Sequence, residues 1–386
     1  MSVAVILTIA IAVITTFIWA IVTWADSQPP DRLELAVERW TVDLSDPQRY
    51  RLGGTLLMKN LNPKSEATLN QFQPRLVLLS DGNLDGIHTR MRYESTENPR
   101  DDNYWVATLI GSQEALPIKV SIELTGEGLD QLKSAFLQVN YIQYGRKLRQ
   151  SKFGHVVCPL RDPAPMQESD WQERSNSHVM PVRTPLLTSQ DDLSSIARDY
   201  VKPWAQPGDY LALAETATAI VQGNYRHPSS IQPQLLARTL CHFFPSKTSL
   251  CSAYGMQTLI DTSNSWRVAF AFIAGVLAKA IGQSGVFYAL AGYQAALIDD
   301  LTGTLPPYDQ FLVLGPENPQ ETVDRVRDET GIEVAIVDAN DLGEVKILAA
   351  TPGIDRETLI EALRSNPAGN AAEQTPLVLV RPLGDR

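Results

Sequence analysis

The sequence has too few cysteines for a disulfide framework or a zinc site. Its 386 residues include three, Cys158, Cys241 and Cys251, and their spacings match no zinc or redox motif. Histidine is also scarce, since there are five and none form the HExxH pair of zinc hydrolases. We therefore interpret the cysteines as ordinary thiols in a reducing compartment.

Basic charge is in short supply as well. The net charge is -11, whereas proteins that bind nucleic acid usually carry a basic surface, so we expect no nucleic-acid partner. The composition, 44% hydrophobic and 20% charged, is that of an ordinary globular protein. At ~150 residues per domain, the length allows two or three domains.

Charged residues are absent from positions 3–24, an apolar run of 22 residues. As a helix the run would span roughly 33 Å, enough for a hydrocarbon core of ~30 Å. No Lys or Arg precedes it and no clear A-x-A site follows it, so residues 1–25 are predicted to be an uncleaved transmembrane anchor rather than a signal peptide. Arg32 and Arg39 follow the run, which predicts a single-pass membrane protein with the bulk of the chain in the cytoplasm.

Two domains are predicted behind the anchor. Residues 32–160 contain seven alternating segments separated by turns such as Asp81-Gly82-Asn83, which predicts a β-sandwich of immunoglobulin-like type. Residues 161–181 are rich in Pro, Ser and charged residues without a hydrophobic period, which is typical of a linker. In residues 182–386 strands alternate with helices, so we expect a mixed α/β domain and an α+β fold class for the whole chain.

A polar cluster follows one buried strand of the second domain. The apolar residues 334–337 run directly into Asp338, Asn340 and Asp341. Two interpretations remain open: the loop needs polar turn formers, or the carboxylates hold a cation where open α/β folds place their ligands. The segment "IDDLTGT" raises a similar choice, because its turn could cradle an anion beside two carboxylates or could simply end a strand.

Several motifs resemble the coenzyme F-420 gamma-glutamyl ligase family over residues 182–386, in the manner of a cyanobacterial, membrane-anchored type. They are "TPLLTSQDDLSSIARDYV", the Gly-Asp strand that follows it, "DTSN", and "GPENPQETVDRVRDETGIEVAIVDANDLG". The resemblance implies a ligase that joins the amine of L-glutamate to the carboxylate of a small-molecule substrate. It implies GTP as co-substrate, Mg²⁺ or Mn²⁺ as cofactor, and a homodimer.

The resemblance also implies site residues. Hard divalent cations prefer oxygen ligands, which makes Asp261, Asp338 and Asp341 the candidate metal ligands. An ungapped match places Asn340 where the family has its metal-binding Asp, so Asp338 or Asp341 would take that role here. The candidate nucleotide- or substrate-binding residues that the resemblance implies are Ser263, Asn264 and Asn340. Asp299, Asp300 and Thr302 of "IDDLTGT", a segment with no clear family counterpart, are further candidates from their residue types alone.

The sequence departs from the family where phosphate is held. After the Gly-Asp strand the family carries Lys and Ser residues and Glu-Gly, whereas this chain has Thr216, Ala219, Ile220 and Gln222-Gly223. Candidate replacement phosphate ligands are Arg238, Lys247, Arg267, Lys279 and Lys346. A non-catalytic ligand-binding protein or membrane scaffold of the same fold is therefore the alternative to the ligase.

Overall fold

The computed structural model describes residues 33–144, 150–246, 248–298, 305–369 and 373–383. The predicted anchor, residues 1–25, lies outside these ranges. Among the described residues, no helix combines the length and the apolar character needed to cross a membrane. The chain divides into two compact units. The first holds most of the amino-terminal strands, and the second consists of Val77–Leu84, Asp130–Phe136 and the chain from Val157 onward.

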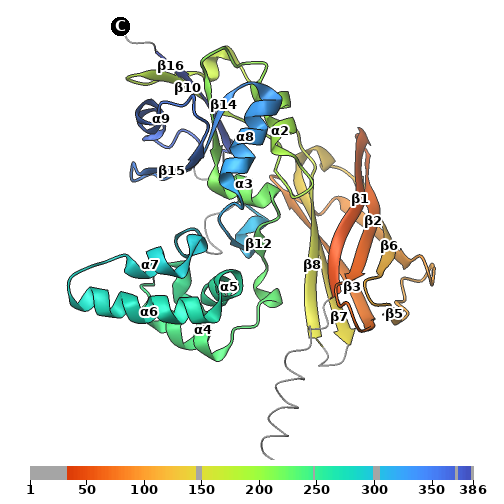
Figure 1. The fold of residues 1–386 in the computed structure, drawn as a ribbon. Helices are drawn as coiled ribbons and strands as arrows, with labels where there is room; N and C mark the ends of the chain where they lie inside the picture. Colours follow the sequence, from red (N-terminus) through yellow and green to blue (C-terminus); the bar gives the residue numbers. More distant parts are fainter. Residues whose placement is uncertain (1–32, 145–149, 247, 299–304, 370–372, 384–386) are drawn as a thin grey trace, which may run out of the picture. The chain divides into compact units, whose positions relative to one another are not determined.

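The amino-terminal strands confirm the predicted immunoglobulin-like β-sandwich. Two four-stranded sheets have the orders β1-β2-β6-β4 and β5-β3-β7-β8 (Figure 1). Their strands are β1 (Leu33–Asp46), β2 (Arg49–Asn60), β3 (Ala67–Ser80), β4 (Ile87–Ser95), β5 (Thr108–Ile110), β6 (Ala115–Gly126), β7 (Leu132–Tyr144) and β8 (Gln150–Pro159). Alternation is clearest in β6, where every second side chain from Leu116 to Leu124 is buried.

There are eight described strands in this domain rather than the expected seven, because β1 shows no regular alternation. Among the described strands it lies at the edge of its sheet and pairs with β2. Its register shifts between Val37 and Arg39, and the next residue, Trp40, pairs with Gly54. A Cβ on Gly54 would lie 1.9 Å from the Arg39 carbonyl oxygen, so only glycine allows the two backbones to approach this closely.

The second unit is built on a six-stranded sheet of order β15-β14-β11-β16-β10-β9. β11 and β14 are parallel, and the other neighbouring pairs are antiparallel. The strands are β9 (Gln172–Glu173), β10 (Ser177–Val182), β11 (Tyr210–Ala214), β14 (Glu333–Ala339), β15 (Val345–Ala350) and β16 (Leu377–Pro382). β9 and β10 come from the segment where we expected a linker.

Helices cover both faces of this sheet. One face packs against α2 (Leu193–Ile196), the π-helical turn Ala197–Val201 and α8 (Pro319–Thr330). The other face packs against α9 (Arg356–Leu363). α3 (Glu215–Val221) begins directly after β11. The mixed α/β prediction for this domain is confirmed.

A separate group of helices has its own apolar core. We call residues 225–298 the helical lobe; it contains α4 (Leu235–Leu240), α5 (Ala253–Ser263), α6 (Ser265–Ala280) and α7 (Val286–Ala291). It begins with β12 (Tyr225–Arg226), which pairs with β13 (Leu312–Val313). Helix α6 is the longest of these four helices and is drawn in teal beside α5 and α7 (Figure 1).

Candidate functional site

A cavity of about 450 Å³ opens in the second unit at one end of its sheet. Ala214 ends β11, Ala339 ends β14, and both line the cavity together with Pro376, which precedes β16. Because β11 and β14 are parallel neighbours, their carboxyl ends meet at the same edge. Open α/β sheets bind their ligands in such a crevice.

The cavity combines apolar walls with a few polar side chains. Glu215 and Thr216 project from the start of α3, and Asp338 and Asn340 from the end of β14. The other polar lining residues come from two further loops and one short helix: Thr184, Tyr308, Asn366, Gln374 and Thr375. This mixture of an apolar wall with a small number of polar groups is typical of a small-molecule site.

The polar residues at the end of β14 and in the turn after it have different roles. Side chains 334–337 are buried and Asp338, the next residue, is exposed at the cavity. The Asn340 Oδ1 accepts hydrogen bonds from the backbone amides of Leu342 (3.0 Å) and Glu344 (3.1 Å), so its side chain shapes the turn. Asp341 Oδ1 accepts a bond of 2.8 Å from Asn366 Nδ2, which ties the loop to the next segment.

Asp261, Ser263 and Asn264 lie in the helical lobe and are not among the described residues that line the cavity. Asp261 accepts from Arg226 Nη1 (3.1 Å) and from Gln257 Nε2 (2.7 Å). Asn264 has φ 147° and caps α6 by accepting from the backbone amide of Trp266. The "DTSN" motif thus forms the junction between α5 and α6.

The structure does not gather the three predicted metal ligands into one cluster. Across the described ranges, no group of three or more His, Cys, Asp or Glu side chains is placed to hold a metal ion. The ion pair with Arg226 balances the charge of Asp261, although both side chains are over a third exposed and the pair contributes at most about 1 kcal/mol. Asp299, Asp300 and Thr302 fall outside the described residues.

Two side chains that line the cavity were not found from the sequence. Tyr308 is 1% exposed and its hydroxyl donates to the carbonyl oxygen of Leu187 at 2.9 Å. Burial raises the pKa of Tyr308 well above its usual value, so it stays neutral. Glu215 was also missed, although a carboxylate directly after the buried run of β11 was a signal of the same kind as Asp338.

The loop that leads into α8 is held by amide side chains. Gln222 Oε1 accepts from the backbone amide of Glu317 (2.7 Å), and Gln222 Nε2 donates to the Glu317 carbonyl (2.9 Å). Gln294 forms the same kind of pair with Gly315, accepting at 2.7 Å and donating at 3.0 Å. The glutamine that stands where the family has Glu therefore has a structural partner here.

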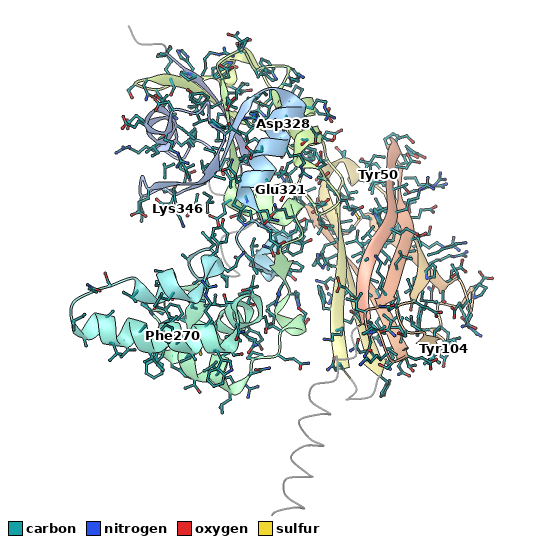
Figure 2. All side chains as sticks on the ribbon, in the orientation of Figure 1. Tyr50, Tyr104, Phe270, Glu321, Asp328 and Lys346 are labelled. Carbon is teal, nitrogen blue, oxygen red and sulfur yellow. The ribbon has the colours of Figure 1, made fainter. Side chains whose placement is uncertain are left out.

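Basic side chains are absent from the described cavity lining. Arg267 instead donates to the carbonyl of Leu290 at 2.8 Å, within the helical lobe. Lys346 lies on β15, in register with Asp338, and is labelled in Figure 2. Arg238 and Lys279 belong to the helical lobe, and Lys247 lies outside the described residues.

Comparisons with known proteins give two family matches. Residues 34–162 match the model of the F420-0:gamma-glutamyl ligase N-terminal Ig-like domain, and residues 181–356 match the F420-0:gamma-glutamyl ligase model. Curated protein sequences give no match.

Two solved structures show weak likenesses to this chain. A yeast GGA1 GAE domain is 15% identical, covers 34% of this chain and 96% of that one, and has a TM-score of 0.21. A protein from Archaeoglobus fulgidus is 8% identical, covers 33% of this chain and 94% of that one, and has a TM-score of 0.18. Scores at this level support no functional argument.

Proposed function

Because the chain belongs to the F420-0:gamma-glutamyl ligase family, we propose that it joins the amine of L-glutamate to the carboxylate of a small-molecule substrate, with GTP and a divalent cation. The observation that carries this proposal is the cavity at the carboxyl ends of β11 and β14. It lies where open α/β folds bind ligands. Most of its described lining belongs to the segment that matches the ligase model.

The lining fits a hard divalent cation. Glu215 and Asp338 bring two carboxylates, and Thr216 adds a neutral oxygen. Mg²⁺ is usually held by one or two carboxylates, with waters and substrate phosphates completing its shell, so a third acidic side chain is not required. When bound, such a cation neutralises charge on a phosphoryl group that activates the substrate carboxylate. Glu215 and Asp338 would hold it, and the neutral Tyr308 would wall the cavity.

The lining fits the phosphates of GTP less well, since it contains no Lys or Arg among its described residues. That observation favours the second candidate function, a non-catalytic protein of the same fold that binds a small molecule. The two candidates differ in their response to nucleotide. A ligase binds the cation and the nucleotide together for its reaction, whereas a simple binding protein binds its small molecule without either.

The test is thermal denaturation of the full chain in detergent with Mn²⁺ or Mg²⁺, each alone and with GTP or ATP. A cation that binds only the native state adds about 2.7 kcal/mol at a hundredfold excess over its Kd. We expect Mn²⁺ with GTP to raise the melting temperature and Asp338→Asn to remove most of that rise. Asp199→Asn, an exposed position on the π-helical turn, should keep it.

Asp261→Asn distinguishes the cation site predicted from the sequence, which includes Asp261, from the site in the cavity, which contains Glu215 and Asp338. The position of Asp261 in the helical lobe leads us to expect that this variant keeps the Mn²⁺ response. A wild-type chain that responds to neither cation, with or without nucleotide, would leave the binding-protein alternative standing and the ligase proposal refuted.

We also propose that residues 1–25 anchor the protein as a single membrane span with the two units in the cytoplasm, and that the protein forms a homodimer. The support for the anchor is the uncharged run of residues 3–24. Amino-terminal sequencing of membrane-fraction protein tests it, because a chain that begins near Ala25 or Asp26 has lost the run.

A further inference from the structure

Helix α6 presents a continuous apolar stripe to solvent. Trp266, Phe270, Ile273, Leu277 and Ile281 are 85%, 65%, 60%, 65% and 76% exposed. Their spacing of three or four residues places them on one face of the helix. Figure 2 labels Phe270 on this helix. An exposed apolar surface of this kind marks an interaction site.

The opposite face of α6 already has partners. Val268 and Ala271 are fully buried in the core of the helical lobe, and Gly275 lies close against Phe287 of α7. The exposed stripe is therefore not needed to hold the lobe together, and its apolar character calls for a separate explanation.

Helix α6 is basic in an acidic protein. The chain has a net charge of -11, yet residues 225–298 contain five Lys and Arg residues and one carboxylate, Asp261, before Asp299 and Asp300 follow. That carboxylate is paired with Arg226. Helix α6 itself carries Arg267 near its start and Lys279 near its end, with no acidic residue between them.

We propose that α6 lies on the surface of a membrane that contains anionic lipids. The stripe would enter the boundary between headgroups and acyl chains, with Arg267 beside it at the level of the lipid phosphates. Lys279 lies four residues after Gly275, on the other face of the helix, and adds to the positive charge of the lobe. Trp266, at the start of the helix, is a residue type that favours this interface. The proposal depends on neither the chemistry of the cavity nor the amino-terminal anchor.

A second copy of the chain fits this surface less well than a membrane does. Two copies would bring two basic lobes together, and α6 offers no carboxylate to pair with Arg267 or Lys279 of the other copy. Like charges placed together across an interface oppose association. A sheet of lipid phosphates supplies the missing negative charge.

The test places a fluorescent label on the full chain through Ile273→Cys, in a Cys251→Ser background because Cys158 and Cys241 are buried. The labelled protein is reconstituted with phosphatidylcholine vesicles or with vesicles that also contain phosphatidylserine. Quenching by a lipid-attached group and by a water-soluble one is then measured. Tyr104→Cys gives a matched control label, since Tyr104 is 67% exposed and lies in the other unit.

With phosphatidylserine present, we expect lipid quenching at position 273 to be severalfold above that at position 104. This difference should be absent in vesicles of phosphatidylcholine alone and should become smaller at high salt. The double variant Arg267→Glu/Lys279→Glu should lower the lipid-contacting population about tenfold, while Lys202→Glu, at an exposed position, leaves it unchanged. Circular dichroism checks that each variant is folded.

Two outcomes overturn the proposal. Equal access of the water-soluble quencher to both labels, in both kinds of vesicle, would mean that the stripe stays in water. Protection from that quencher without lipid quenching, together with cross-linking between the introduced thiols of two chains, would mean that a second copy covers the stripe.

Discussion

Replacement of Arg381 should destabilise the second unit far more than replacement of a surface arginine. Arg381 on β16 donates from Nε to Asp209 Oδ1 (3.0 Å) and from Nη2 to Asp209 Oδ2 (2.9 Å). The Asp209 side chain is 2% exposed. The guanidinium also donates to the Trp204 carbonyl and stacks 4.3 Å from the ring centroid of Trp171. It therefore joins β16 to the segments that flank β11 and β9.

The expected loss follows from the carboxylate left behind. Removing one partner of a buried ion pair costs about 3 to 5 kcal/mol. Here the lower end applies, because Asp209 keeps a bond of 2.8 Å from the Gln206 amide and the Arg381 side chain is 28% exposed. In contrast, the pair Arg198–Glu329 has side chains 48% and 42% exposed and contributes at most about 1 kcal/mol.

Native-state hydrogen exchange of the full chain measures both losses in the same unit. In Arg381→Met, a loss of about 3 kcal/mol should make the slowest amides of β11 and β16 exchange about a hundredfold faster. In Arg198→Met the change should be about fivefold or less. The double variant Arg381→Met/Asp209→Asn should recover part of the loss, since it removes the unpaired charge. Equal effects of Arg381→Met and Arg198→Met would refute the reasoning.

Two further predictions concern pH and packing. Burial lowers the pKa of His227 below its usual 6.5, so the unfolded state binds the proton more readily than the native state. The free energy of unfolding should therefore fall as pH drops through 6.5. Hydrogen exchange across that pH range measures this dependence, which should be lost in His227→Asn. A Cβ on Gly315 would lie 2.5 Å from Leu297 Cδ1 and 2.7 Å from Leu297 Cβ. Gly315→Ala should therefore lower the free energy of unfolding by about 1 to 3 kcal/mol in urea denaturation. Gly86→Ala is the control and should cost much less, because the atom nearest to its new Cβ would be 3.5 Å away.

Local patterns predicted most of the elements correctly. The alternation of β6 and the apolar run of α6 are properties of neighbouring residues, so they can be read without knowing what each element touches. β10 was taken for part of a linker because its Pro and polar neighbours hide the alternation. It becomes a strand by pairing with β16, about two hundred residues further along the chain, with Ser177 opposite Pro382.

In the candidate site, too, a local pattern was predicted from the sequence and long-range contacts were not. The sequence by itself placed a carboxylate at the end of a buried strand, and Asp338 does line the cavity. Only the tertiary structure made that position a cavity, by pairing β14 in parallel with β11. It also gave the Asp341 carboxylate a hydrogen bond from Asn366 and the Asp261 carboxylate an ion pair with Arg226. Hydrogen-bond and ion-pair partners come from distant segments that folding brings together, and no local pattern of residues records them.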